Sequence, residues 1–281
     1  MKTKSEVGMQ HCRTGAAEAK SECRSEPASG HRESYFWPEP PKDGLLTIIG
    51  LEARHISRVM RHEVGSIIGV VDGAGAEHEV ELTVVRADRV VGRVLSDTRW
   101  AREPKHRVAI AQAVLKGDHL AQVCAQATEL GVSRIIPFQS ARTVGRLSPA
   151  RSERLRAVSL AALKSSARTM LPTIDAAVVF GGLLNLDGEF DQVLVAYEDE
   201  SGPGLGTVLK RDVRSVLIVV GPEGGFEPSE IDALKAAGAV TFSLGPRRLR
   251  AETAAVAAAA MTLGFLGDLG YVGYSESTQT T

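Results

Sequence analysis

The chain has 281 residues, which is enough for one large domain or two ordinary ones. It is 43% hydrophobic and 24% charged, the balance of a soluble globular protein. No run of about 18 apolar residues predicts a membrane-spanning helix. The formal net charge of -1 argues neither for nor against a nucleic-acid ligand, so the distribution of charge along the chain has to decide.

The three cysteines are widely spaced and form no Cys-x-x-Cys pair: Cys12, Cys23 and Cys124. This spacing predicts neither a zinc site nor a disulfide framework, and it favours a reducing, cytoplasmic compartment. Residues 1–33 contain few large apolar side chains, so ordering them would cost more entropy than burial returns. We expect a disordered extension there and no metal site.

Residues 34–100 have the pattern of a small β-rich domain. β-Branched or alternating runs predict strands at 46–49, 67–71, 77–85 and 89–94. Between the first two strands, residues 52–61 follow a helical period that places Ile56, Val59 and Met60 on one face. The same helix is rich in Arg and His. Residues 96–107 are polar and predict a linker to the next domain.

Strands alternate with helices in the rest of the chain. Apolar runs predict strands at 108–114, 134–138, 193–197, 216–220 and 239–244, and helical patterns span 118–130, 149–166, 228–237 and 252–266. Gly131 and Gly238 are typical stops for the helices before them. This alternation predicts an α/β domain with a mainly parallel sheet, in which the uniformly apolar run 216–220 is buried on both faces.

Two of these strands end abruptly in glycine and proline. Residues 221–226 read Gly-Pro-Glu-Gly-Gly-Phe, and residues 245–250 read Gly-Pro-Arg-Arg-Leu-Arg. Open α/β sheets bind ligands at such strand ends, and the arginines add concentrated positive charge. The first segment is neither a dinucleotide fingerprint nor a P-loop. Glycines that serve turn geometry alone are the plain alternative. The alanine-rich helix that follows fits either a good helix former or a close-packed dimer interface.

A basic stretch lies between residues 141 and 171. It contains Arg142, Arg146, Arg151, Arg154, Arg156, Lys164 and Arg168, with Glu153 as its acidic residue. Solvated helix faces usually carry charges of both signs, so the one-sided charge favours contact with a phosphate backbone.

The motifs together resemble the 16S ribosomal RNA (uracil-N3) methyltransferases of the SPOUT class. The resemblance rests on residues 221–226, on 229–231 (Ser-Glu-Ile), on Leu244-Gly245 and on 249–254 (Leu-Arg-Ala-Glu-Thr-Ala). Lys116-Gly117-Asp118, residues 127–132 and residues 54–61 extend it upstream. It covers about residues 34 to 270. The pair of glycine motifs at this spacing is specific, whereas either motif alone is not.

The resemblance implies a fold, a cofactor and a substrate. The fold would be a PUA-like, RNA-binding β-barrel domain at residues 34–100 and a SPOUT α/β knot domain at 101–270, followed by a flexible tail at 271–281. S-adenosyl-L-methionine would lie in the trefoil knot, and the enzyme would be a homodimer packed through that knot. The reaction would be methylation of N3 of a specific uridine in 16S rRNA or the small ribosomal subunit.

The resemblance also assigns residues. Those expected to hold the cofactor, mostly through backbone atoms, are Tyr197, Gly221, Pro222, Gly224, Gly225, Leu244, Gly245, Leu249, Thr253 and Ala254. Those expected to bind RNA are Arg54, His55, Arg61, Arg142, Arg146, Arg154 and Arg168. From its place between Leu249 and the start of the next helix, Arg250 is our candidate for stabilising negative charge on the uracil oxygens. Glu223 is the candidate base, although it could equally hold its loop by accepting backbone N–H bonds.

This chain departs from the family pattern at a few positions, such as Ser165 and Ala251. Three alternatives stay open at this point. The chain could be a SPOUT methyltransferase acting on tRNA or 23S rRNA, or a non-catalytic RNA-binding protein of the same architecture. It could also be a small-molecule α/β enzyme that uses the glycine turns for phosphate, which predicts nucleotide binding and indifference to RNA.

Overall fold

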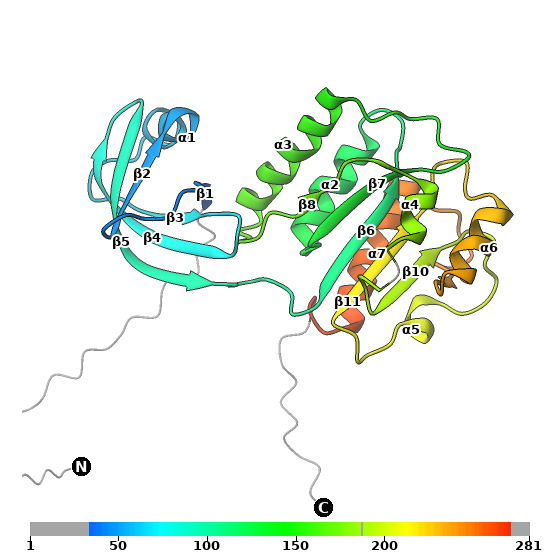
Figure 1. The fold of residues 1–281 in the computed structure, drawn as a ribbon. Helices are drawn as coiled ribbons and strands as arrows, with labels where there is room; N and C mark the ends of the chain where they lie inside the picture. Colours follow the sequence, from blue (N-terminus) through cyan, green and yellow to red (C-terminus); the bar gives the residue numbers. More distant parts are fainter. Residues whose placement is uncertain (1–33, 187, 271–281) are drawn as a thin grey trace, which may run out of the picture. The chain divides into compact units, whose positions relative to one another are not determined.

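The computed structural model describes residues 34–270 with the exception of residue 187. The expected extension at 1–33 and tail at 271–281 therefore lie outside the described residues. Two β-sheets organise the described chain (Figure 1). None of the helices in this part of the chain has the length and apolar character needed to cross a membrane.

The N-terminal sheet has five strands in the order β1-β3-β4-β5-β2. They are β1 (Ser34–Phe36), β2 (Leu45–Ile49), β3 (Ile67–Val71), β4 (Ala76–Val85) and β5 (Arg89–Arg99). β1 runs parallel to β3, and the other neighbours are antiparallel. The four predicted strands are confirmed. The sheet curls, but its edges β1 and β2 do not pair within the described residues, so it forms a half-barrel where a barrel was expected.

The helical segment of this domain differs from the prediction. The α-helix α1 (Gly50–Arg54) continues as a π-helical turn, η1 (His55–Val59). A π turn has more residues than an α turn, so a face assigned with the α-helical period goes out of register along η1. Ile56 is fully buried as expected, but Val59 is 65% exposed and Met60 41% exposed. Ala53 takes their place in the core.

The linker is shorter than residues 96–107. β5 extends to Arg99, and its last residues pair with the start of β4. All side chains from Leu95 to Arg99 are exposed, so this end of the strand carries no apolar alternation for the sequence pattern to reveal. Cross-strand polar contacts, such as that of His78 Nδ1 with Asp97 Oδ1 at 2.6 Å, take the place of apolar packing.

The C-terminal sheet is entirely parallel and has the order β12-β10-β11-β6-β7-β8, with β9 also beside β7. The strands are β6 (Arg107–Ala113), β7 (Arg134–Gln139), β8 (Thr173–Ile174), β9 (Val178–Val179), β10 (Gln192–Ala196), β11 (Ser215–Val220) and β12 (Val240–Phe242). The predicted α/β class with a parallel sheet is confirmed. The two-residue strands β8 and β9 were not predicted, because they are too short to show a period.

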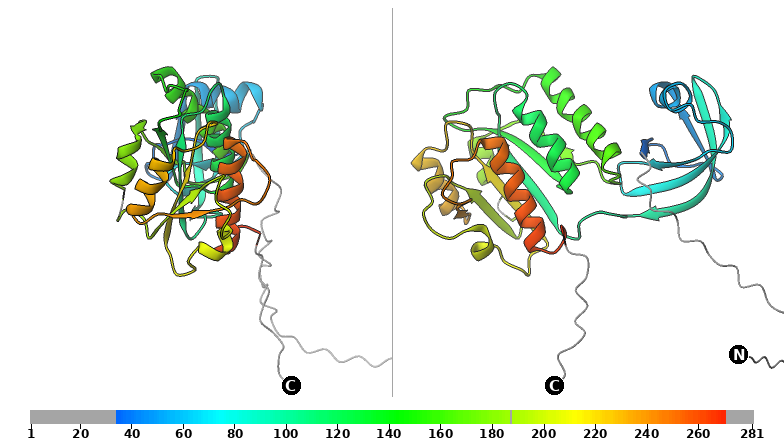
Figure 2. Two further views of the ribbon diagram at one scale, coloured as in Figure 1. Left: turned by 90° about the vertical axis from the view of Figure 1, so that its right-hand side faces the viewer. Right: turned by 180° about the vertical axis from the view of Figure 1, so that it is seen from behind.

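Helices cover both faces of this sheet. They are α2 (His119–Leu130), α3 (Pro149–Ser165), α4 (Phe180–Leu184), α5 (Leu205–Val208), α6 (Pro228–Ala236) and α7 (Ala251–Phe265). α2, α3, α5 and α7 contribute to one core and α4 and α6 to the other, and the right-hand view of Figure 2 shows α2, α3 and α7 on one side. The short helices α4 and α5 were not predicted.

The central strand β11 shows why the sheet needs both layers. Val216, Ile218 and Val220 belong to the core under α2 and α7, whereas Leu217 and Val219 belong to the core under α4 and α6. The whole strand is buried, as the uniform apolar run predicted.

The ends of the helices also follow the sequence signals. Gly131 ends α2 in the left-handed conformation with φ +105°, which is the predicted helix stop. In α7, Ala255, Ala258 and Ala259 are fully buried within the chain's own core, so the small residues serve close packing against the sheet.

Candidate active site

A cavity of about 1250 Å³ lies at the carboxyl ends of β10, β11 and β12. Because these strands are parallel, the loops that follow them meet at one edge of the sheet. The wall is formed by residues 196–201, 220–225 and 243–252, together with Ala254 and His119. Both glycine motifs therefore contribute to one cavity.

The first glycine turn packs closely against its neighbours. Gly225 has φ +70°, and a Cβ added there would overlap the Glu198 carboxylate. A Cβ at Gly221 would lie 3.0 Å from the Phe226 ring, which itself stacks on Phe138 with a centroid distance of 6.3 Å. Glycine is needed at Gly225 for its backbone conformation, whereas the exposed Glu198 side chain could move away from a Cβ.

The second glycine turn supplies free positive charge. Gly245 has φ +96°, and Arg247, Arg248 and Arg250 follow it on the cavity wall. All three arginines are exposed, and none makes an ion pair or side-chain hydrogen bond with a described residue. Their guanidinium groups are therefore available to an anionic ligand.

The loop after β10 forms an acidic wall of the same cavity, with Glu198, Asp199 and Glu200. The Glu200 carboxylate accepts a hydrogen bond from the Thr241 hydroxyl at 2.7 Å, and this bond is the main cause that lowers the pKa of Glu200. Desolvation raises the pKa of the neighbouring Tyr197, with Asp199 and Glu198 adding to the shift. The cavity thus has one cationic and one anionic side.

Comparison with known proteins places the chain in a family. A family profile described as an RNA methyltransferase domain matches residues 101–263. The chain is 36% identical to ribosomal RNA small subunit methyltransferase E of Bacillus subtilis over 74% of its own length and 86% of the relative. It is 32% identical to the Mycobacterium bovis protein of that name, over 78% and 86%.

The chain belongs to the ribosomal RNA small subunit methyltransferase E family. A solved member from Neisseria gonorrhoeae, crystallised with S-adenosyl methionine, superimposes with a TM-score of 0.76. It is 26% identical and the match covers 83% of this chain and 98% of that one. This likeness confirms the SPOUT-class fold. The segment between β12 and α7 lies beside Pro203, whose carbonyl accepts the Ser243 N–H at 3.1 Å.

The cavity brings together nearly all residues expected to hold the cofactor. Tyr197, Gly221, Pro222, Gly224, Gly225, Leu244, Gly245, Leu249 and Ala254 line it. Thr253 does not line it and is exposed on the first turn of α7. The placement fits the expectation, and the contacts themselves stay predictions.

Glu223, the expected base, lines the cavity but has a structural partner. Its Oε1 accepts a hydrogen bond from the Lys116 N–H at 2.8 Å. The carboxylate therefore ties the β11 turn to the loop before α2, which is the loop-holding role that the sequence left open.

Sequence reasoning missed the acidic loop at 198–200 and two further residues of this site. His119 and Glu252 lie on the cavity wall, with 3.4 Å between His119 Nδ1 and Glu252 Oε1. They lie in the first turns of α2 and α7, which are distant in the sequence but packed side by side (Figure 2). The position of His119 directly after Lys116-Gly117-Asp118 was the available signal, but a lone histidine gives no hint of its partner.

The residues expected to bind RNA fall into two groups. Arg54, Arg61, Arg146 and Arg154 are exposed, although Arg154 pairs with Asp118 at 2.8 Å. The second group, which makes contacts within the chain, consists of His55, Arg142 and Arg168.

In this second group, the His55 ring lies edge-on to Tyr35 at 5.9 Å. Arg142 donates a hydrogen bond to the Gly224 carbonyl at 3.1 Å, so it lies at the glycine turn of the cavity. Phosphate contacts by these residues stay predictions.

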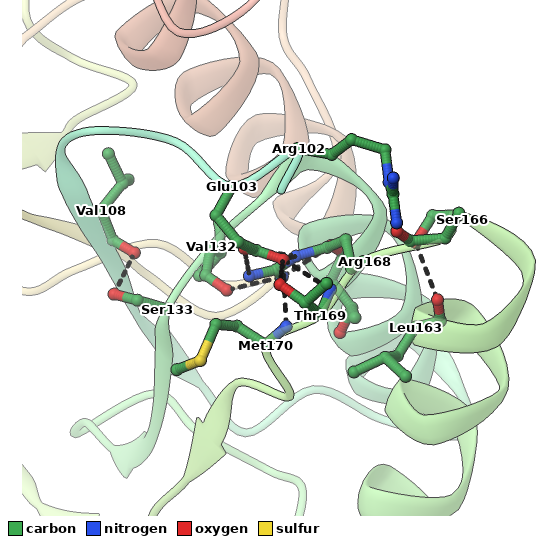
Figure 3. Close-up of polar contacts among 12 residues, drawn as sticks. Arg102, Glu103, Val108, Val132, Ser133, Leu163, Ser166, Arg168, Thr169 and Met170 are labelled. Carbon is green, nitrogen blue, oxygen red and sulfur yellow. Dashed lines mark hydrogen bonds and ion pairs between the residues drawn. The ribbon is translucent and has the colours of Figure 1, made fainter. Parts of the chain in front are cut away.

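Arg168 does not fit the expectation of an RNA contact. It is 4% exposed, and its guanidinium donates to Glu103 Oε2 at 2.7 Å and to the carbonyls of Thr128 and Val132 (Figure 3). Glu103 also accepts the Thr169 and Met170 N–H groups. A run of basic residues in the sequence cannot reveal this burial, because the acidic partner is far away in the chain. Arg168 is a structural residue that joins the linker to the segment after α3.

Within residues 34–270, residue 187 aside, no group of three or more His, Cys, Asp or Glu side chains is placed to hold a metal ion.

Proposed function

We propose that this chain is an S-adenosylmethionine-dependent methyltransferase that methylates N3 of a specific uridine in small-subunit ribosomal RNA. The observation that carries the proposal is the single cavity between the two glycine turns, with three free arginines on its wall, in a chain of this family. S-adenosylmethionine supplies an electrophilic methyl group on a sulfonium centre.

The residues present fit this cofactor. The positive φ values of Gly225 and Gly245 are conformations that glycine adopts without strain, and they shape the two turns on the cavity wall. Leu244 and Leu249 offer apolar surface for a flat base, and the acidic loop after β10 faces a cationic ligand favourably. The cavity of about 1250 Å³ exceeds the roughly 300–1,000 Å³ of ordinary ligand pockets, which leaves room for a nucleotide beside the cofactor.

Arg250 would act on the methyl acceptor. Methylation at N3 removes the proton of that nitrogen, and the negative charge spreads onto the two ring carbonyl oxygens. N3 lies on the pairing edge of the base, so the uridine has to be unpaired or flipped out of the stack. A preorganised guanidinium near those oxygens stabilises the charge. Arg250 is exposed on the cavity wall and has no partner among the described residues.

The RNA backbone would bind outside the cavity. Arg54, Arg61 and Arg146 are exposed cations without a described ion pair. Such residues bind phosphates in a sequence-independent and salt-dependent way, while the cavity selects the base.

We also propose a homodimer that packs through the knot region. Met261 and Phe265, one turn apart on α7, are 39% and 44% exposed, which leaves an apolar strip on this helix. Light scattering on the purified chain tests this assembly, and a monomer at micromolar concentration would contradict it.

Methyl transfer assays test the function. The purified chain is given radiolabelled S-adenosylmethionine and, separately, small subunits, free 16S rRNA, large subunits or tRNA. We expect label only in small-subunit RNA, and N3-methyluridine after nuclease digestion. Label in tRNA or 23S rRNA would favour the alternative of another RNA substrate. Absence of cofactor binding by calorimetry would favour a non-catalytic RNA-binding protein.

The Arg250→Ala variant tests the assigned role. We expect kcat to fall by about 10²–10³-fold, the usual effect of removing one charge-stabilising donor, with unchanged cofactor affinity. Arg250→Lys should keep part of the rate because it keeps the charge. Arg211→Ala, in an exposed loop outside the cavity, is the matched control. Wild-type turnover of Arg250→Ala would show that the role is wrong.

A further inference from the structure

Among the described residues on the cavity wall, His119 is the only imidazole. It is the first residue of α2, and its side chain is 43% exposed. Its Nδ1 lies 3.4 Å from Oε1 of Glu252, whose side chain is only 9% exposed. A half-exposed imidazole beside a nearly buried carboxylate is the arrangement in which one group moves a proton and the other orients it.

The loop that carries His119 is fixed from several directions. The Glu223 carboxylate accepts the Lys116 N–H at 2.8 Å. The Arg151 guanidinium donates to the Leu115 carbonyl at 2.9 Å and to the Gly117 carbonyl at 2.7 Å. These contacts reach the residues directly before His119, so the backbone from which the imidazole projects is held in place before any ligand binds.

Three other polar residues of the wall, Glu223, Glu200 and Tyr197, are less suited to accept a proton. The Glu223 carboxylate already accepts a hydrogen bond from the backbone N–H of Lys116. Glu200 accepts hydrogen bonds from Thr241 and from the Gly202 N–H, and its lowered pKa makes it a weaker base. The Tyr197 hydroxyl has a raised pKa and stays protonated.

We propose that His119 is the proton acceptor for the methylated uridine and that Glu252 is its positioning residue. The proposal rests on the proposed function. Nδ1 lies on the Glu252 side of the ring, 3.4 Å from Oε1. In the proposed role the carboxylate favours the proton on Nδ1, which leaves Nε2 as the nitrogen that accepts the proton of the uridine. The imidazole tautomer is thereby set by Glu252.

The proton and electron balance is complete without a further reactant. The N3–H bond breaks and its proton goes to Nε2 of His119. The electron pair left on N3 forms the new bond to the methyl carbon, and the electrons of the broken carbon–sulfur bond stay on sulfur. The imidazolium then releases the proton to water. The loop is fixed by Glu223 and Arg151 and needs no rearrangement for these steps.

The experiment compares four variants with the wild type in single-turnover methyl transfer at saturating S-adenosylmethionine. The methyl-transfer rates of His119→Ala and His119→Gln should both be lower than that of the wild type by about 10²-fold or more, the usual contribution of a general base. Cofactor affinity, measured by calorimetry, should stay at the wild-type value. Gln122→Ala is the matched control, since Gln122 is exposed on the same helix and does not line the cavity. It should keep the full rate.

Chemical rescue separates proton transfer from a structural role. Added imidazole should restore part of the rate of His119→Ala, because it fits the vacated space, and should not restore His119→Gln. Glu252→Gln should lose part of the rate without rescue, since it removes the charge that orients His119.

Two results would overturn the inference while the proposed function stands. One is a His119→Ala rate near that of the wild type. The other is a slow His119→Ala enzyme that has also lost cofactor affinity and does not respond to imidazole. Failure of the wild type to methylate any RNA would instead contradict the proposed function, and with it the inference.

Discussion

The buried pair of Glu103 and Arg168 makes the sharpest stability prediction. The two side chains are 6% and 5% exposed, and the shortest nitrogen–oxygen distance between them is 2.7 Å. Figure 3 shows Glu103 at the centre of the contacts that also involve Thr169 and Met170. Glu103→Gln keeps the size of the side chain and an acceptor oxygen, but it leaves the Arg168 guanidinium as an uncompensated buried charge.

The size of the effect follows from the burial. Removing one partner of a buried ion pair lowers the free energy of unfolding by about 3–5 kcal/mol. In a domain of roughly 150–250 residues, each kcal/mol lowers Tm by about 2–4 °C, so we expect a fall of roughly 6–20 °C. The exposed pair of Arg93 and Glu81, with side chains 63% and 33% exposed, is the matched reference. Glu81→Gln should cost about 0–1 kcal/mol, as exposed pairs do.

Thermal and urea unfolding of both variants, followed by circular dichroism, measure these effects. The double variant Glu103→Gln/Arg168→Met should be more stable than Glu103→Gln alone, because it removes the unpaired charge. Equal losses for Glu103→Gln and Glu81→Gln would refute the structural role of the buried pair. They would also reopen Arg168 as an RNA contact.

Three further outcomes are expected. Gly225→Ala should weaken S-adenosylmethionine binding in calorimetry. It should also lower the free energy of unfolding by about 1–2 kcal/mol, because the new side chain is strained at positive φ. Gly181→Ala, where a Cβ has open space in α4, should cause neither effect. Arg146→Ala should weaken RNA binding and reduce the slope of log affinity against log salt by about 1, whereas Arg211→Ala should leave both unchanged. Burial raises the pKa of Cys124 to about 12, so the folded protein holds this thiol protonated and unreactive at pH 8. Iodoacetamide at that pH should leave the Cys124 peptide unmodified in the folded protein and modify it in urea. Rapid modification without urea would contradict this expectation.

The raised pKa of Cys124 also has a consequence for stability. Above the ordinary value of 9.0, the unfolded thiol loses its proton while the buried one keeps it. The unfolded state then binds fewer protons than the folded state, so this group makes the protein less stable as pH rises from about 9 to 12.

The sequence was a good guide wherever one local signal determines the structure. The apolar run of β11 and the glycine after α2 predicted a doubly buried strand and a helix end. The glycine motifs also predicted where the cavity lies, because parallel strands end at one edge of the sheet.

It was a poor guide where structure depends on distant partners or on changes of period. The exposed end of β5 is paired through polar residues, and the turn at His55 has π geometry. Arg168 is neutralised by Glu103, and His119 meets Glu252, through contacts that no single-sequence period reveals. The same limit explains why Arg168 was assigned to RNA and His119 was overlooked.

The central claim is that the cavity methylates N3 of a uridine in small-subunit rRNA. Nucleoside mass spectrometry of rRNA from cells with and without the gene tests it most directly. We predict that deletion removes a single N3-methyluridine from small-subunit rRNA, that the wild-type gene restores it, and that Arg250→Ala does not. An unchanged N3-methyluridine content in the deletion strain, or loss of a modification from tRNA or large-subunit rRNA instead, would contradict the claim.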